Sequence, residues 1–192
     1  MDIDFSNNSY SIIRNGISKE LNKFLQIQTE LFVNMYCILS QKIPTDFNDD
    51  SVQKSFSDYA PPISEPLLLL LQKKVEEIVG KKLEPTYSYL RVYYNGAILK
   101  KHTDRESCEY SVTLCVKNNI LPWDIWFDTK NGNKNISLNE CDFIIYKGME
   151  LPHWREKYED KEQIQIFLHY VEANGPYKQF KLDNRLALML QK

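Results

Sequence analysis

The 192-residue sequence has almost no surplus charge of either sign and no long apolar run. It carries 24 Lys and Arg residues against 26 Asp and Glu residues, a formal net charge of -2. Such a chain has no overall positive field to attract nucleic acid or an anionic membrane surface. Its apolar runs reach only about five residues, as in the five leucines at 67–71, whereas a membrane-spanning helix needs about 20 apolar residues. We therefore expect no nucleic-acid partner and no membrane role, and we interpret the leucine run as a packing face.

The sequence also lacks paired cysteine motifs and a secretory signal. Its four cysteines, Cys37, Cys108, Cys115 and Cys141, form no C-x-x-C pair, which argues against a zinc knuckle or a thioredoxin-type dithiol. Residues 1–4 (MDID) are acidic and have neither the cationic nor the apolar region of a secretory leader. We expect reduced, buried thiols in a cytoplasmic protein.

Two helices are expected in the first part of the chain. Apolar residues recur at helical spacing between positions 18 and 39, and Ser18 is a favourable capping residue at the start of this stretch. A second helix is expected at 65–80, because Pro66 lies in its first turn and Gly80 at its end. The segment 44–66 contains Asp-Asp, Pro-Pro and several serines, which favours an irregular loop.

From Pro85 onward the pattern changes to short aromatic and β-branched runs, which are typical of strands. Asn95-Gly96 is a strong signal for a two-residue hairpin, and Asn131-Gly132 indicates another turn. Strands are predicted at 87–94, 97–101, 109–116, 124–128, 141–146 and 163–171.

These elements predict a mainly β (α+β) fold that forms one domain overall. Many short strands in succession close most economically as a barrel or a two-sheet jelly roll, with the early helices packed across one outer sheet. We assign residues 1–84 to an N-terminal helical support region and residues 85–192 to the barrel core with a C-terminal tail.

The sequence has three histidines, and all of them lie in the predicted β-rich half. In His102-Thr103-Asp104 the first and third side chains point to the same side of an extended segment, so both can reach one ion. His153 follows 141–146 and the turn at Lys147-Gly148, so a third ligand could arrive from another strand.

Two imidazoles and one carboxylate on one side of a metal leave the opposite side open. This arrangement suits non-haem iron(II) oxygenases, because O2 and a chelating cosubstrate need vacant positions. Zinc would accept the same three ligands and a water molecule. His102, Asp104 and His153 alone therefore do not distinguish oxidation from hydrolysis.

The stretch 93–104 (YYNGAILKKHTD) resembles the Y-x-x-G…H-x-D stretch of 2-oxoglutarate- and Fe(II)-dependent dioxygenases of the prolyl 4-hydroxylase-like type. Residues 141–146 followed by His153 resemble the strand that leads to the distal histidine of that family. The similarity covers positions 87–171, roughly half of the chain. The resemblance implies a double-stranded β-helix fold and iron ligation by His102, Asp104 and His153. It also implies a hydroxylase that consumes 2-oxoglutarate and O2.

The sequence departs from this family where most members have a basic residue that binds the distal carboxylate of 2-oxoglutarate. The strand after the second histidine reads EQIQIF. Its expected inward positions have no cation; they are Gln163, Gln165, Phe167 and His169. Arg155 is our preferred substitute, because it lies two residues beyond His153 on the same strand face and its guanidinium can pair with both carboxylate oxygens. Tyr94 and Gln165 could add neutral hydrogen bonds, and Arg105 is a second basic candidate.

Three functions remain open. The first is a 2-oxoglutarate-dependent hydroxylase acting on a protein or peptide side chain, or on a small molecule. The second is a cupin-like hydrolase or isomerase that uses zinc or manganese. The third is a β-barrel without catalytic activity that binds a partner protein. We interpret His169, in an aromatic strand, as a core or rim residue and not as a ligand.

Overall fold

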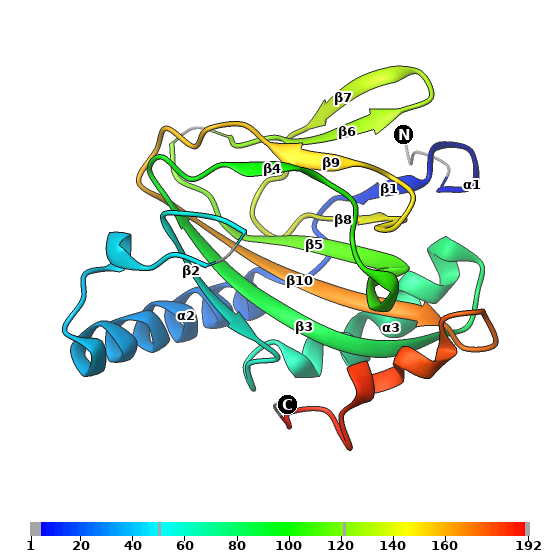
Figure 1. Cartoon of the computed structure of the whole chain (residues 1–192), viewed down its shortest axis with the longest axis horizontal. Helices are drawn as coiled ribbons and strands as arrows, with labels where there is room; N and C mark the ends of the chain where they lie inside the picture. The colour runs from blue at the N-terminus through cyan, green and yellow to red at the C-terminus, as the bar shows by residue number, and fades with distance from the viewer. Residues whose placement is uncertain (1–4, 50, 121, 191–192) are drawn as a thin grey trace.

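The computed structural model describes residues 5–49, 51–120 and 122–190 (Figure 1). Residues 1–4, from which we expected a cytoplasmic protein, lie outside the described residues. Two antiparallel sheets carry the fold. The larger contains, in spatial order, β1 (Tyr10–Ile13), β8 (Phe143–Tyr146), β5 (Tyr110–Lys117), β10 (Glu162–Glu172), β3 (Leu83–Tyr94) and β2 (Ser55–Tyr59). The smaller contains β4 (Leu99–His102), β9 (His153–Arg155), β6 (Ile125–Thr129) and β7 (Gly132–Ile136).

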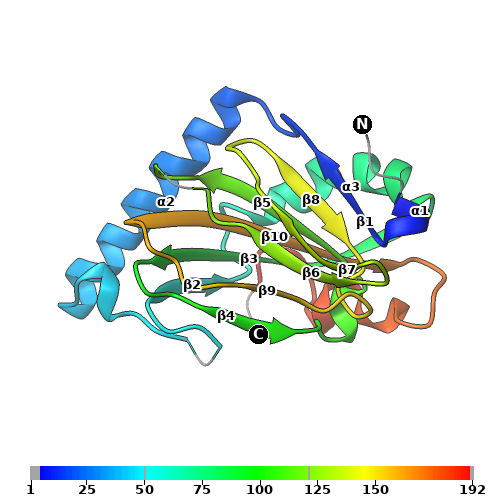
Figure 2. The same cartoon turned by 90° about the horizontal axis from the view of Figure 1, so that it is seen from above.

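Helices cover the outer face of the six-stranded sheet, as Figure 2 shows. The long helix α2 (Lys19–Ser40) begins at Ser18, whose hydroxyl accepts a hydrogen bond from the Leu21 N–H. Helix α3 (Glu65–Val79) ends at Gly80, which has the positive φ of 73° that favours glycine. The shorter helical segments are α1 (Phe5–Asn8), η1 (Pro44–Asp46), η2 (Glu106–Cys108) and η3 (Lys178–Asn184). The predicted mainly β fold with outer helices is confirmed. Within the described ranges, no helix is long and apolar enough to cross a bilayer.

The central strands of the large sheet are buried on both faces, but the two faces differ in polarity. Along β10, Ile164, Ile166 and Leu168 belong to the hydrophobic core under the helices. The alternate residues Gln165 and His169 are also buried, on the face toward the smaller sheet. Because successive strand residues point to opposite sides, one strand supplies both the core and the lining of the interior between the sheets.

The segment predicted as an irregular loop contains an ordered strand. β2 pairs with β3 at one edge of the large sheet, and β1 pairs with β8 at the other. Both strands are short and partly polar, as edge strands often are, so neither has a clear apolar alternation. The region 1–84 therefore supplies β1, β2 and the first two residues of β3 as well as helices, and the boundary at residue 84 stays a prediction.

Asn95-Gly96 forms a turn, but the predicted hairpin is wrong. Gly96 has a φ of 92°, and the Ala97 N–H donates to the Tyr94 carbonyl at 3.0 Å. After the turn, β4 joins the smaller sheet and pairs with β9, while β3 stays in the larger sheet. By contrast, Asn131-Gly132 connects the paired strands β6 and β7. A turn signal determines the local reversal, whereas the sheet that the next strand joins depends on the strand with which it pairs.

All four cysteines are free thiols. Cys108, Cys115 and Cys141 are buried, and Cys37 on α2 is half-buried. Burial raises the pKa of Cys108 and of Cys115 to about 12, because a thiolate would lose its hydration. Both thiols are therefore protonated at neutral pH.

The C-terminal segment is held to α3 by a buried ion pair. Arg185 Nη1 donates to Glu65 Oε2 at 2.9 Å, and both side chains are 1% exposed or less. Arg185 Nη2 also donates to the carbonyl of Thr86 at 2.8 Å. The other oxygen of Glu65 accepts from the backbone N–H and the hydroxyl of Ser88. These hydrogen bonds tie together a helix, a strand of the large sheet and the chain end.

Replacing Arg185 with Ala should lower the free energy of unfolding by about 3–5 kcal/mol, because Glu65 would remain charged, buried and without its cation. Lys181→Ala is the matched control, since its ion pair with Glu84 is 54% and 30% exposed and should contribute about 1 kcal/mol or less. Urea unfolding of the three proteins measures both changes. Equal losses in the two variants would contradict the importance of the buried pair.

Candidate metal centre

His102, Asp104 and His153 come together at the facing ends of two paired strands. His102 ends β4 and lies opposite His153, the first residue of β9, with ring centroids 4.3 Å apart. Asp104 Oδ1 lies 3.7 Å from His102 Nε2 and 3.6 Å from His153 Nε2. One ligand atom from each residue lies within 4.8 Å of the other two. Ligand atoms lie about 2.0–2.2 Å from a bound metal, so these three can share one ion.

Backbone carbonyls orient both imidazoles. His102 Nδ1 lies 2.8 Å from the carbonyl of Lys100, and His153 Nδ1 lies 3.0 Å from that of Leu151. A carbonyl oxygen only accepts, so each Nδ1 carries the proton and each Nε2 presents a lone pair toward Asp104. Burial lowers the pKa of His153, because the charged imidazolium would lose hydration. Both rings are therefore prepared to bind a cation through Nε2.

Ser111 orients the carboxylate. Its hydroxyl donates to Asp104 Oδ2 at 2.7 Å and lies 3.0 Å from Nδ1 of His169. Since the single hydroxyl proton goes to the carboxylate, His169 Nδ1 is the donor to Ser111 Oγ. Burial lowers the pKa of His169 to about 4, so this imidazole is neutral at pH 7. His169 thus supports the ligand Asp104 through Ser111. The sequence predicted only a core or rim residue here, and the structure gives that residue this additional role.

Gly148 lies against the same carboxylate, and any side chain there would collide with it. A Cβ at this position would come within 2.4 Å of Asp104 Oδ2, 2.5 Å of the Cys108 carbonyl oxygen and 2.6 Å of Ser111 Oγ. The Gly148 carbonyl accepts from the Asp104 N–H at 2.9 Å. The sequence indicated only a turn here, whereas the structure shows that the absence of a side chain makes room for the ligand.

A second group of possible ligands, Asp104, Cys108 and His169, also lies within 4.8 Å. It shares Asp104 with the first group. The thiol of Cys108, with its pKa raised by burial, lies 3.1 Å from the Tyr87 hydroxyl. His169 Nδ1 is already engaged by Ser111. The first group is therefore the better metal site.

The first group borders a cavity of about 560 Å³ between the two sheets. Both histidines and Asp104 line it, so the site adjoins open space. Aromatic and basic side chains form much of the remaining wall, among them Tyr87, Tyr89, Arg91, Arg105 and Phe167.

Arg155, two residues beyond His153 on β9, is fully buried and only partly hydrogen-bonded. Its Nη1 donates to the Trp123 carbonyl at 2.5 Å, while Nε and Nη2 have no partner in the described part of the chain. Gln165 faces Cys115 across the sheet and its side chain interacts with the Cys115 thiol, but its amide atoms find no oxygen or nitrogen partner among the described residues. Burial lowers the pKa of Arg155. A buried guanidinium with free donors is costly unless something anionic or polar pairs with it.

The other predicted cosubstrate residues lie elsewhere. Tyr94 points to the helix-covered core, beside residues of α2, so the structure does not bring it to the site. Its neighbour Tyr93 occupies the inward position, where its ring packs edge-on against Trp123 with ring centroids 4.8 Å apart. No sequence signal distinguished the two neighbouring tyrosines, because only the pairing of β3 with β10 determines which of them faces inward. Arg105 lies at the cavity rim, 51% exposed, and pairs with Asp183 at 2.9 Å.

Ser111→Ala should raise the dissociation constant for Fe(II) or Co(II) by about 10–100-fold, because the carboxylate loses the hydrogen bond that orients it. Anaerobic calorimetric titration of the metal-free protein measures this change. Ser88→Ala is the matched control, since Ser88 is a buried serine of the same sheet that bonds Glu65 on the helix side. Metal affinity that is equal in Ser111→Ala and in the unaltered protein would remove Ser111 from the site.

The buried His169 should make the metal-free protein less stable in acid. An unfolded histidine has a pKa of about 6.5, so the unfolded chain takes up this proton first as the pH falls. The free energy of unfolding is therefore unaffected by His169 above about pH 6.5. As the pH falls from 6.5 to 4, the protonation of His169 in the unfolded chain lowers this free energy by about 3 kcal/mol in all. His169→Asn should therefore lose less stability between pH 7 and pH 4.5 in urea unfolding with a chelator present. Parallel losses would contradict the neutral buried imidazole.

Comparison with known proteins agrees with this architecture. No protein-family model matches the sequence, and no curated protein matches it significantly. Among solved structures, AviO1 from Streptomyces viridochromogenes is 11% identical, with a TM-score of 0.71 over 90% of this chain and 94% of that chain. A prolyl-4-hydroxylase from Pseudomonas putida is also 11% identical, with a TM-score of 0.67 over 88% and 95%. A Trichoplax adhaerens prolyl hydroxylase is 12% identical, with a TM-score of 0.67 over 95% and 90%. The chain therefore has the double-stranded β-helix fold found in 2-oxoglutarate- and Fe(II)-dependent oxygenases.

Proposed function

We propose that this protein is an Fe(II)- and 2-oxoglutarate-dependent oxygenase that hydroxylates a C–H bond of its substrate. The observation that carries the proposal is the pairing of two features in one interior: a ligand set of two histidines and one carboxylate beside a cavity, and the buried, incompletely hydrogen-bonded guanidinium of Arg155 two residues further along β9.

The donor set fits iron(II). Two neutral imidazoles and one carboxylate are the ligands of non-haem iron oxygenases, and the adjoining cavity leaves room for further ligands. When bound, the iron would couple the oxidation of 2-oxoglutarate by O2, giving succinate and CO2, to insertion of the second oxygen atom into the substrate C–H bond.

The residues around Arg155 fit a dicarboxylate. Side chains two residues apart on a strand are separated by about 6.6 Å, so a five-carbon dicarboxylate can reach from the metal site at His153 toward the guanidinium. Nε and Nη2 of Arg155 are free to pair with one carboxylate, and the Gln165 amide can donate to it. Burial strengthens these charge-assisted hydrogen bonds and excludes water.

Two related structures support this assignment and bear on the substrate. HygX from Streptomyces hygroscopicus, with 10% identity and a TM-score of 0.68, was solved with nickel, 2-oxoglutarate and hygromycin B bound. The Trichoplax prolyl hydroxylase was solved with a peptide fragment. The cavity of this protein, with tyrosine, phenylalanine and arginine side chains in its wall, is compatible with a protein or peptide side chain or with a small molecule.

The two alternative functions make less use of the site. A zinc- or manganese-dependent hydrolase or isomerase could use His102, Asp104 and His153, but such a reaction gives no role to the free donors of Arg155. A binding module without catalytic activity accounts for neither the metal-ligand geometry nor the oriented imidazoles.

Anaerobic addition of Fe(II) and then 2-oxoglutarate tests the proposal. A visible metal-to-ligand charge-transfer band should appear only when both are present, and admission of O2 should then yield succinate. Zinc binding without a response to 2-oxoglutarate would support a hydrolase, and failure to bind any metal would support the binding module. Either result would overturn the proposed function.

Arg155→Ala should weaken 2-oxoglutarate binding at saturating Fe(II) by about 30-fold or more, the usual cost of removing one partner of a buried charged hydrogen bond. Arg155→Lys should be intermediate, because it keeps the charge without the planar fork. Iron affinity should change little. Titration of the charge-transfer band measures both affinities.

Two further variants separate binding from folding. Arg155→Met removes an incompletely paired buried charge but keeps side-chain volume, so the stability of the metal-free protein should be equal or higher, while 2-oxoglutarate affinity falls. Arg105→Ala, at the cavity rim, should leave 2-oxoglutarate affinity unchanged. Loss of affinity in Arg105→Ala but not in Arg155→Ala would move the anchor to Arg105.

A further inference from the structure

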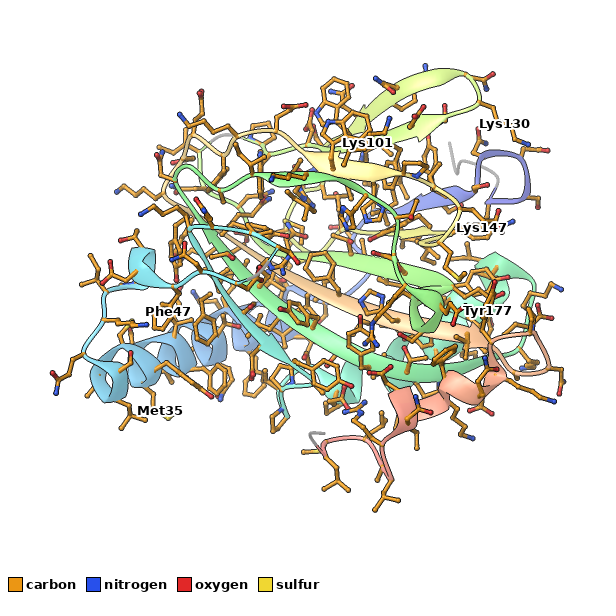
Figure 3. All side chains as sticks on the ribbon, viewed as in Figure 1. Met35, Phe47, Lys101, Lys130, Lys147 and Tyr177 are labelled. Carbon is orange, nitrogen blue, oxygen red and sulfur yellow. The ribbon has the colours of Figure 1, made fainter. Side chains whose placement is uncertain are left out.

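Helix α2 carries an apolar stripe on the side that faces away from the protein. Phe24, Ile27, Leu31, Met35 and Ile38 are between 45% and 77% exposed. Their spacing of three and four residues puts them on one face of the helix. A surface helix normally presents polar residues to water, so this α2 stripe has the composition of a covered surface. Met35, labelled in Figure 3, lies at the outer edge of the molecule.

The apolar surface continues onto α3. Leu69 and Leu70 are 59% and 62% exposed, which corrects the expectation that the whole leucine run packs inward, since only Leu67, Leu68 and Leu71 are buried. A groove between the two helices, lined by Phe24, Pro66 and Leu70 among others, connects this pair to the α2 stripe.

The area of this surface matches that of a stable protein interface. The five stripe residues, together with Leu39, Leu69 and Leu70, expose on the order of 800 Å² of apolar surface, if each large side chain offers roughly 170 Å². The largest apolar patch on an ordinary monomer is about 300–600 Å². One partner in a standard interface contributes about 800 Å².

The α2 stripe is complementary to itself in an antiparallel arrangement. If two copies of α2 cross at Leu31, Leu31 meets its own counterpart, Phe24 lies opposite Ile38, and Ile27 lies opposite Met35. These pairs are equidistant from Leu31 in sequence, by seven and by four residues. A two-fold symmetric interface requires this kind of self-matching surface.

Charges at the ends of the α2 stripe favour the same arrangement. Glu20 lies in the first turn of α2, and Lys42 lies two residues beyond its last residue, Ser40; both are exposed. An antiparallel pair brings Glu20 of each copy toward Lys42 of the other, whereas a parallel pair would bring like charges together. Between them, the polar residues Gln28 and Asn34 also face one another.

We propose that the protein forms a two-fold symmetric homodimer through antiparallel packing of α2 against α2 of a second copy, with Leu31 at the axis and Leu69 and Leu70 at the margin. The interface lies on the helix side of the six-stranded sheet, opposite the cavity between the sheets. Dimerisation therefore leaves both cavities accessible and is independent of the proposed oxygenase activity.

Sedimentation velocity over a concentration series tests the dimer. Leu31→Glu should raise the dimer dissociation constant at least 100-fold, because two carboxylates would meet at the axis in an apolar surface. Since Leu31 is 61% exposed, the thermal unfolding of the monomeric variant should remain cooperative. Ile98→Glu, at a residue that is 47% exposed in the turn between β3 and β4, is the matched control and should remain dimeric.

A charge exchange tests the antiparallel register. Glu20→Lys and Lys42→Glu should each weaken the dimer, and the double variant should restore it, because the opposite charges then meet again. A wild-type protein that stays monomeric, including one that instead binds lipid vesicles through this surface, overturns the proposal. A dimer unaffected by Leu31→Glu, or single exchanges that the double variant does not rescue, also overturns it.

Discussion

The six-stranded sheet must bury both of its faces, and this constraint determines where the chemistry can occur. Isoleucine and leucine side chains of β10 bury one face by packing against α2 and α3. The other face carries glutamine, serine and histidine into the interior between the sheets. Desolvating such groups is costly without partners. The interior is therefore stable only because neighbouring side chains, or a ligand, complete its hydrogen bonds.

The candidate metal centre illustrates how that cost is met. Each histidine uses the backbone carbonyl two residues earlier in the chain, so the imidazole orientation follows from local backbone geometry. Asp104 lies beyond the strand end and depends on Ser111, His169 and the bare backbone of Gly148. Arg155 remains incompletely paired, and this deficit is the feature that a dicarboxylate cosubstrate would satisfy.

The two sides of the sheet separate two properties of the protein. Residues that point inward form the cavity and its ligand set, whereas the helices on the outer side present a broad apolar surface to a second copy. Stability depends on yet another region, where Glu65 and Arg185 join α3 to the C-terminal segment. Substitutions in these three regions should therefore affect chemistry, association and folding separately.

The sequence alone was sufficient for much of the architecture, because the relevant signals are local. Ser18, Pro66 and Gly80 mark the ends of helices through their own backbone preferences. The alternation along 163–171 identified the inward residues of β10. The spacing of His102 and Asp104 also predicted two side chains on one side, since both belong to the same segment.

Non-local pairing was decided only by the tertiary structure. The short edge strands β1 and β2 have weak apolar patterns, and β4 left the predicted hairpin because its partner is β9. Tyr93, and not Tyr94, points inward because the register of β3 against β10 sets its face. The roles of Ser111 and Gly148 depend on contacts with Asp104 made by segments distant in sequence. The exposure of Leu69 and Leu70 likewise follows from where α3 packs, because a run of identical residues contains no signal for which of them face the core.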